Sequence, residues 1–240
     1  MPAAEERLVQ LIKFGTMKRI REHVNNNPTM DLHYPTWHST TPLTTAIDRS
    51  DPMIVGFLID KLPTDLNSTL TQACGRTALM HAARCAKNPE ILSVLIKKGA
   101  DVSKTDVNGW SCLFYAVVGE RLSNLAALLD CGLSIEAADR DGRTPLMISV
   151  YLASYEVFSG LLARQADPNA VDRHGLNALH LAIIRRRRDC VLELSSRRWG
   201  VVERPSPFTG TSTRRLREEI MLDMLPSKRR AYDECEHDDG

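Results

Sequence analysis

The eight residues at 139–146, D-R-D-G-R-T-P-L, decide the fold of this chain. Gly142 permits the positive φ angle that a tight turn requires. Thr144 can cap a helix by accepting a hydrogen bond from a free backbone N–H of the first turn. Pro145 suits the first helical position, because its missing N–H would have no partner there. The stretch therefore predicts a turn followed by a helix that begins at Pro145.

The same pattern recurs along the chain at a nearly constant interval. Glycines stand at positions 75, 109, 142 and 175, which are 34, 33 and 33 residues apart. A short segment with Thr, Ser or Asn at its capping position recurs in the same register: T-T-P-L at 40–43, R-T-A-L at 76–79, W-S-C-L at 110–113, R-T-P-L at 143–146 and L-N-A-L at 176–179. A fixed period of roughly 20 to 50 residues is typical of repeat proteins. The sequence thus predicts five units.

Each unit has the composition of two packed helices. Small residues in its first half let a helix approach its neighbours closely, and leucine-rich pairs in its second half supply apolar bulk. The small residues include Ala82, Ala83, Ala116 and Ala182, and the apolar pairs stand at 95–96, 128–129 and 161–162. Such a unit cannot bury its apolar face alone, so neighbouring units must stack to form a core.

This pattern resembles the ankyrin repeat, whose motif is Asp-x-x-Gly-x-Thr-Pro-Leu followed by an alanine-rich helix and a Leu-Leu helix. Residues 139–146 match the motif best, and the resemblance covers about residues 5–200. The chain departs from the ankyrin motif in two ways. The usual histidine after leucine is kept only in L-H-L-A at 179–182, and Ser149 and Val150 replace the usual alanine pair in the fourth repeat. The resemblance implies an all-α ankyrin-repeat solenoid of helix-turn-helix units with short β-hairpin-like fingers.

The repeat register divides the chain into three segments. Residues 1–38 lack the Thr-Pro-Leu motif but carry apolar residues at helical spacing, so we expect an N-terminal helical cap or divergent repeat. Residues 39–200 hold five ankyrin repeats. The first repeat is 36 residues long, from Thr41 to Thr77, so we expect a longer connection at 62–71. Residues 201–240 are expected to form a linker, an amphipathic helix and a disordered charged tail.

Composition and charge disfavour several classes of protein. The 31 basic and 30 acidic residues nearly cancel, so no global field favours nucleic acid or an anionic membrane. No apolar stretch approaches the roughly 18 residues that cross a bilayer. The six cysteines include no C-x-x-C pair, which disfavours a compact zinc site and a disulfide framework. We expect a soluble, monomeric protein with reduced thiols in the cytoplasm and/or the nucleus.

The resemblance also implies where a partner binds. The family's variable contact positions lie at the finger tips and on the first helices, which form the concave face of an ankyrin array. On this register they are Val107, Asn108, Trp110, Arg140, Asp141, Arg143, Tyr151, Arg173, His174 and Leu176. Arginine and aromatic residues are enriched at binding hot spots, so we expect another protein or a peptide, of partly acidic character, as the partner. In the alternative interpretation, Trp110 and Tyr151 are half-buried packing residues and the arginines are ordinary solvated charges.

The sequence carries no signature of an enzyme. It lacks the G-x-S-x-G, G-x-G-x-x-G, Walker and H-E-x-x-H motifs that position nucleophiles, phosphates or metals. The histidines at 33 and 38 form a close pair without a nearby cysteine, which is more typical of an incidental pair than of a metal site. We expect no catalytic residue, no cofactor and no metal.

Residues 185–188, R-R-R-R, fall where an ankyrin unit turns between its two helices. Three interpretations are open: a polar cap for the end of the solenoid, a contact for an acidic protein or for nuclear import, and a nucleic-acid contact. No aromatic residues interleave the run, so we expect at most weak, salt-sensitive DNA binding.

Two functions compete at this point. The first is a non-enzymatic scaffold or regulator that binds a partner protein on the concave face. The alternative is a ubiquitin-ligase substrate adaptor, which uses the repeats for substrate and the C-terminal helix for recruitment. R-L-R at 215–217 and L-P at 225–226 superficially resemble the suppressor-of-cytokine-signalling box of such adaptors, but the expected Leu-Cys pair is missing. The same helix also fits a cap that covers the fifth repeat.

Overall fold

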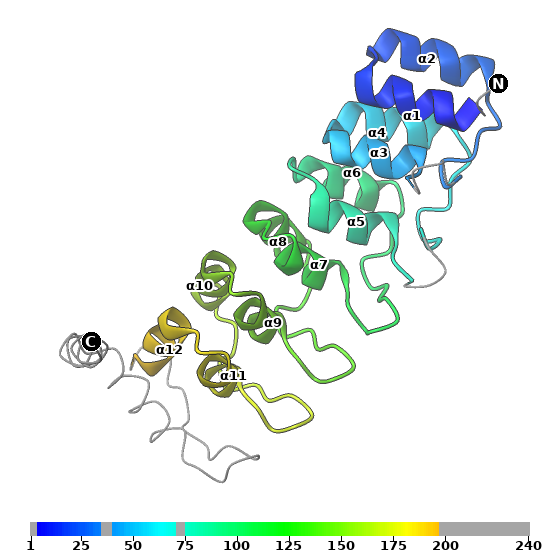
Figure 1. Ribbon diagram of the computed structural model, residues 1–240. Helices are drawn as coiled ribbons and strands as arrows, with labels where there is room; N and C mark the ends of the chain where they lie inside the picture. Colours follow the sequence, from blue (N-terminus) through cyan, green and yellow to red (C-terminus); the bar gives the residue numbers. More distant parts are fainter. Residues whose placement is uncertain (1–3, 35–39, 71–74, 197–240) are drawn as a thin grey trace, which may run out of the picture. The chain divides into compact units, whose positions relative to one another are not determined.

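The computed structural model describes residues 4–34, 40–70 and 75–196, which form twelve helices and no strand (Figure 1). In chain order they are α1 (Ala4–Phe14), α2 (Met17–Asn26), α3 (Pro42–Arg49), α4 (Pro52–Lys61), α5 (Ala78–Cys85), α6 (Glu90–Lys97), α7 (Cys112–Val118), α8 (Leu122–Asp130), α9 (Pro145–Leu152), α10 (Tyr155–Ala163), α11 (Ala178–Ile184) and α12 (Arg188–Ser195). These short helix pairs, joined by finger-like loops, confirm the predicted all-α class of helix-turn-helix units.

The chain divides into two compact units, residues 1–140 and residues 141–240. In the first unit, α1, α3, α5 and α7 pack side by side in one layer, and α2, α4, α6 and α8 pack in a second layer (Figure 1). In the second unit, α9 packs on α11 and α10 packs on α12. The first helix of each repeat therefore lies beside the first helix of the next repeat within a unit.

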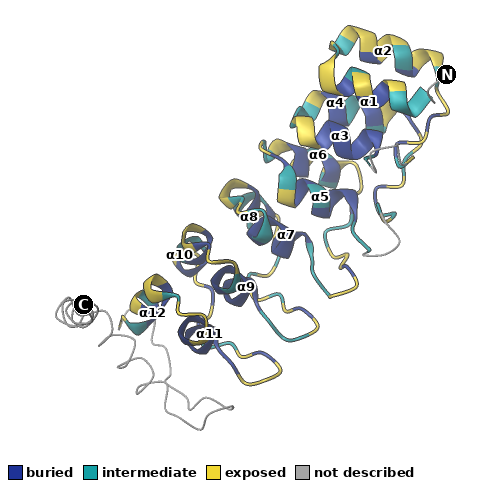
Figure 2. Ribbon diagram, in the orientation of Figure 1, coloured by how far each residue is buried: buried dark blue, intermediate teal, exposed yellow. Residues whose placement is uncertain are grey.

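The core of each unit lies where the two layers meet, and Figure 2 shows the buried positions on the facing sides of the helices. Fully buried apolar side chains recur at three- and four-residue spacing, as expected for a helix with one apolar face. In the first unit they include Leu43, Ile47, Ile54, Leu58, Leu79, Leu95 and Leu113, and in the second unit Val150, Phe158, Leu161 and Val191. Within each unit, stacking of the repeats thus buries a row of apolar residues.

Most of the predicted helix starts are confirmed by the capping hydrogen bonds. A side-chain acceptor at the N-cap binds the backbone N–H three residues on: Thr41 with Thr44 (3.1 Å), Thr77 with Met80 (3.4 Å), Thr144 with Met147 (3.5 Å) and Asn177 with His180 (3.0 Å). Pro42 and Pro145 stand at the first helical positions. Ser111 stands at the N-cap of α7 as predicted, but its side chain does not make the expected capping hydrogen bond.

The N-terminal helix pair expected from the apolar spacing is present as α1 and α2. Leu8, Ile12 and Ile20 are completely buried, and the pair packs on α3 and α4. None of the helices in the described part of the chain has the length and apolarity needed to cross a bilayer. The linker, amphipathic helix and charged tail expected at 201–240 lie outside the described residues, as does His38.

Candidate protein-binding surface

Buried aspartates fix the shape of the fingers. In the third repeat, Oδ1 of Asp106 accepts a hydrogen bond from the backbone N–H of Trp110 (2.8 Å), and the backbone N–H of Asp106 donates to the carbonyl of Trp110 (3.0 Å). In the fifth repeat, Oδ1 of Asp172 accepts from the N–H groups of His174 and Leu176, both at 2.9 Å. These bonds give each loop a hairpin-like turn and place its tip residues at defined positions.

Hydrogen bonds also join neighbouring fingers within each unit. In the first unit the backbone N–H of Arg140 donates to the carbonyl of Asn108 at 3.1 Å, and in the second unit the N–H of Arg173 donates to the carbonyl of Asp141 at 2.8 Å. Gly109, with a φ of +81°, permits this approach, because a Cβ atom there would lie 3.0 Å from the nitrogen of Arg140. The backbone thus fixes the spacing between the tips.

Trp110 is half-buried in the packing of the first unit. Its indole Nε1 donates a hydrogen bond to Oδ2 of Asp139 at 3.1 Å. Its ring stacks on Phe114 with centroids 5.8 Å apart and meets the edge of Tyr115 at 6.0 Å. Both the apolar face and the polar N–H of this side chain therefore have intramolecular contacts, which supports its interpretation as a packing residue.

The finger tips of the second unit carry a cluster of charged side chains. Oδ2 of Asp141 lies 2.9 Å from Nη2 of Arg143, and Oδ1 of Asp141 lies 3.0 Å from Nη1 of Arg173. The Arg173 side chain remains 55% exposed, against 27% for that of Arg143. One carboxylate therefore contacts two guanidinium groups, and these three groups together carry one net positive charge.

Tyr151, near the end of α9, supports an arginine of the next repeat. The guanidinium carbon of Arg185 lies 4.0 Å from the centroid of the Tyr151 ring, which is a cation–π contact. Arg185 caps the C-terminus of α11, so the arginine run begins in the turn between α11 and α12, as expected from the repeat register. The contact holds one arginine of this run in place on an aromatic side chain.

The remaining predicted contact residues differ in how much surface they offer. Val107, Asn108 and Arg140 are exposed in the first unit, and His174 is exposed in the second. Leu176 is only 6% exposed, so it offers almost no surface to a partner. Sequence reasoning placed Arg185 in a solvated turn and missed its contact with Tyr151, whose counterpart one 33-residue repeat later is Ile184.

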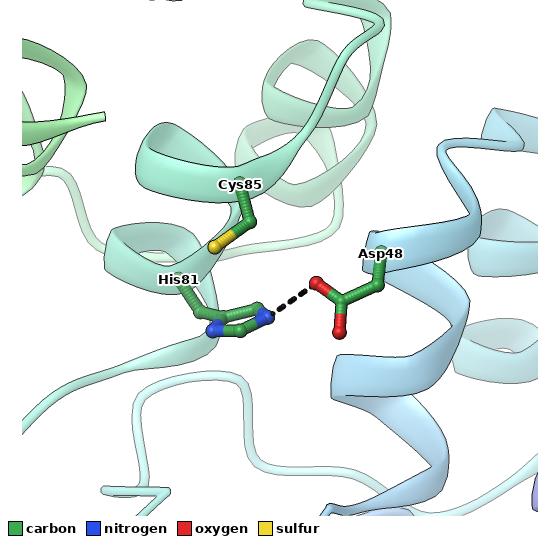
Figure 3. Close-up of side chains that lie close together, drawn as sticks. All are labelled: Asp48, His81 and Cys85. Atoms are coloured by element: carbon green, nitrogen blue, oxygen red, sulfur yellow. Dashed lines mark hydrogen bonds and ion pairs between the residues drawn. The ribbon is translucent and has the colours of Figure 1, made fainter. Parts of the chain in front are cut away.

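A second group of side chains, absent from the sequence predictions, meets between α3 and α5 in the first unit (Figure 3). Nε2 of His81 lies 2.8 Å from Oδ1 of Asp48, and one possible ligand atom from each of Asp48, His81 and Cys85 lies within 4.8 Å of the others. Burial, followed by the nearby Asp48 carboxylate, raises the pKa of the Cys85 thiol. A hollow of about 220 Å³ beside Asp48 and His81 is also lined by Thr44 and Arg76.

We expect iodoacetamide to modify Cys131 far faster than Cys112 or Cys190 in the native protein. Burial raises the pKa of Cys112 to about 12 and that of Cys190 to about 11, whereas Cys131 is exposed. Only the thiolate reacts, so at about pH 8 the two buried thiols should react at least about 100-fold more slowly. Mass spectrometry of the digested protein measures each rate. Similar rates for Cys112 and Cys131 before urea is added would contradict the burial of Cys112.

The stacked helix pairs and their hydrogen-bonded fingers define a repeat solenoid. The family model described as "Ankyrin repeats (3 copies)" matches residues 3–106, 43–139, 86–172 and 127–201. The chain belongs to the ankyrin-repeat family. Ankyrin repeats bind other proteins, and the chain is accordingly a protein–protein interaction domain.

The relatives match this chain over only part of their own length. The chain is 29% identical to "Putative palmitoyltransferase ZDHHC13" of Danio rerio over 74% of the chain and 27% of that protein. It is 34% identical to "Neurogenic locus notch homolog protein 1" of Danio rerio over 47% of the chain and 5% of that protein. It is 35% identical to "Inversin" of Gallus gallus over 42% of the chain and 9% of that protein. The chain therefore spans at most about a quarter of the length of these relatives.

Among solved structures, the ankyrin repeat domain of Bcl-3 superposes with a TM-score of 0.68 at 24% identity, covering 90% of this chain and 97% of that domain. A likeness at this identity shows the fold alone.

Proposed function

We propose that this protein is a monomeric, non-enzymatic scaffold or regulator that binds an acidic segment of a partner protein on the finger tips and first helices of its second unit. In this proposal it acts in the cytoplasm, the nucleus or both. The observation that carries the proposal is the shared salt bridge of Asp141 with Arg143 and Arg173. These three groups together carry one net positive charge and are partly exposed, on fingers whose backbone is fixed by hydrogen bonds.

The Tyr151–Arg185 contact supports the same surface. A guanidinium group held over an aromatic ring loses less conformational freedom when it binds than a free arginine does. Arginine and tyrosine are also among the residues that most often dominate binding energy at protein interfaces. Arg186 in the same turn and Arg188 at the start of α12 are exposed, which adds positive charge next to this contact. Of the three interpretations of residues 185–188, the acidic-protein contact fits this arrangement best.

Because the proposed partner is acidic, removing two arginines from the surface should weaken its binding. In the double variant Arg143→Gln/Arg173→Gln, affinity for a fluorescent peptide of alternating Glu and Leu should fall about tenfold, or about 1.4 kcal/mol, because two favourable charges are removed. Fluorescence anisotropy measures the affinity. Binding by the unaltered protein should also weaken as salt is added, since exposed charges are screened.

Two comparisons decide whether the surface is specific. A Gln/Leu peptide of equal length should bind more weakly than the Glu/Leu peptide. The variant Arg164→Gln changes an exposed arginine at the end of α10, in the other helix layer of the second unit, and should bind as well as the unaltered protein. Equal affinity for both peptides, or an equal loss in the Arg164→Gln variant, would reject the proposed surface.

The alternative function, a ubiquitin-ligase substrate adaptor, depends on the expected C-terminal helix, which lies outside the described residues. Deletion of residues 201–240 separates the two functions. A scaffold of the proposed kind keeps its affinity for the acidic peptide after the deletion. An adaptor also keeps that affinity but loses a second interaction, with the ligase machinery, that the full chain makes.

A further inference from the structure

The cluster of Asp48, His81 and Cys85 combines a carboxylate, an imidazole and a thiol. Zinc is bound in proteins by these three types of group, whereas calcium and magnesium prefer sites built from oxygen alone. His81 and Cys85 are four residues apart on α5, so both side chains lie on one face of that helix, opposite Asp48 on α3 (Figure 3). We propose that these three side chains bind one Zn²⁺ ion between α3 and α5.

The distances suit such an ion after small side-chain rotations. Tetrahedral zinc with ordinary bond lengths places a nitrogen and an oxygen ligand about 3.3 Å apart, and places a sulfur about 3.6 Å from either. The nitrogen of His81 and the oxygen of Asp48 lie 2.8 Å apart, and all three ligand atoms lie within 4.8 Å of one another. The nitrogen and oxygen must therefore separate by about 0.5 Å, and the sulfur lies no more than about 1.2 Å beyond its required separation from either.

Access and charge also suit zinc. The Asp48 side chain is 48% exposed and that of His81 is 21% exposed, so an ion can reach the ligands from solvent. The bound metal keeps the thiol of Cys85 deprotonated. The charges of the Asp48 carboxylate and the Cys85 thiolate then balance the two positive charges of the ion, which reduces the cost of placing it in a partly buried site.

Three protein ligands leave one position of a tetrahedral ion open. The hollow of about 220 Å³ adjoins Asp48 and His81, and its threonine side chains include Thr41 and Thr44. This space accommodates a water molecule as the fourth ligand. The site therefore ties the first helices of two neighbouring repeats together, independently of the binding surface proposed for the second unit.

Cobalt is the direct probe of this site, because Co²⁺ takes the place of Zn²⁺ and reports a thiolate ligand by a sulfur-to-metal charge-transfer band. The full chain titrated with Co²⁺ should develop this band, and Zn²⁺ should displace it. The Cys85→Ser variant should lose the band. His81→Ala and Asp48→Asn should weaken zinc affinity at least about tenfold, because losing even a group that only hydrogen-bonds to a metal ligand costs about 10–100-fold.

Variants of other cysteines test whether the cobalt band arises from this cluster. Cys131→Ser removes an exposed thiol elsewhere in the first unit and should leave the band unchanged. Cys74 lies outside the described residues, and the band should also be unchanged in Cys74→Ser. Circular dichroism checks the helical fold of each variant. Asp48→Asn replaces a side chain by one of nearly the same volume, so it should disturb the packing little. Absence of the band in the unaltered protein, its survival in Cys85→Ser, or its loss in Cys74→Ser would overturn the proposal.

Discussion

Replacement of Asn124 by alanine should lower the free energy of unfolding by about 3 kcal/mol. Asn124 lies on α8 and is completely buried. Its Nδ2 donates hydrogen bonds to the carbonyls of Ala83 (3.0 Å) and Ala86 (2.9 Å). These carbonyls belong to the C-terminal end of α5, where a helix has no internal donors left to offer. Each buried carbonyl that loses its donor costs about 1–3 kcal/mol.

Urea unfolding followed by circular dichroism measures this loss. Asn124→Leu separates the hydrogen bonds from the cavity, because leucine fills a similar volume but offers no donor. We expect Asn124→Leu to remain at least about 2 kcal/mol less stable than the unaltered protein. The neighbouring exposed Ser123, replaced by alanine, should change stability by less than about 0.5 kcal/mol. Full stability in Asn124→Leu would show that Asn124 does not cap α5.

The repeat register made most of the fold predictable. The spacing of the glycines and capping residues placed the first helices, and Pro42 and Pro145 marked two starts directly. These signals are local, because a cap satisfies backbone groups within its own turn. The cap at Ser111 fails although the residue type is suitable, which shows that a capping residue permits the hydrogen bond without ensuring it.

Contacts between repeats were harder to predict, because they depend on which side chains the stacking brings together. Asp48 and His81 are 33 residues apart, but α3 and α5 start 36 residues apart, so the seventh residue of α3 meets the fourth residue of α5. Arg185 likewise follows the register counterpart of Tyr151, Ile184, by one residue and meets the tyrosine ring from the C-terminus of α11. Pairing residues by repeat register alone would have found neither contact, because the place of each side chain on its helix also decides which neighbour it meets.

The candidate binding surface was predictable as a set of positions but not as a set of environments. The resemblance named the finger residues, yet it could not distinguish Arg173, which is largely exposed, from Leu176, which is buried. It also could not show that Trp110 donates to Asp139. These differences arise from packing within and between fingers, which the repeat motif does not specify.

Replacement of Gly119 by alanine should destabilise the protein by about 3 kcal/mol, the upper end of the usual cost of overpacking. Gly119 follows α7 with an ordinary φ of −78°, so no backbone conformation requires a glycine there. The reason is space: a Cβ atom at this position would lie 2.1 Å from the carbonyl oxygen of Arg84. That oxygen belongs to the backbone near the end of α5, so α5 and α7 would have to separate to make room for the new methyl group.

Gly56→Ala provides the matched control, because it makes the same chemical change in a helix that has room for it. Gly56 lies within α4, and a Cβ atom there would meet Cγ1 of Val94 at 3.7 Å, which is ordinary van der Waals contact. Alanine is favoured over glycine within helices by up to about 1 kcal/mol, so this variant should be slightly more stable than the unaltered protein. Urea unfolding should therefore give opposite signs for the two substitutions. Equal stability of Gly119→Ala and the unaltered protein would contradict the close approach of α7 to α5.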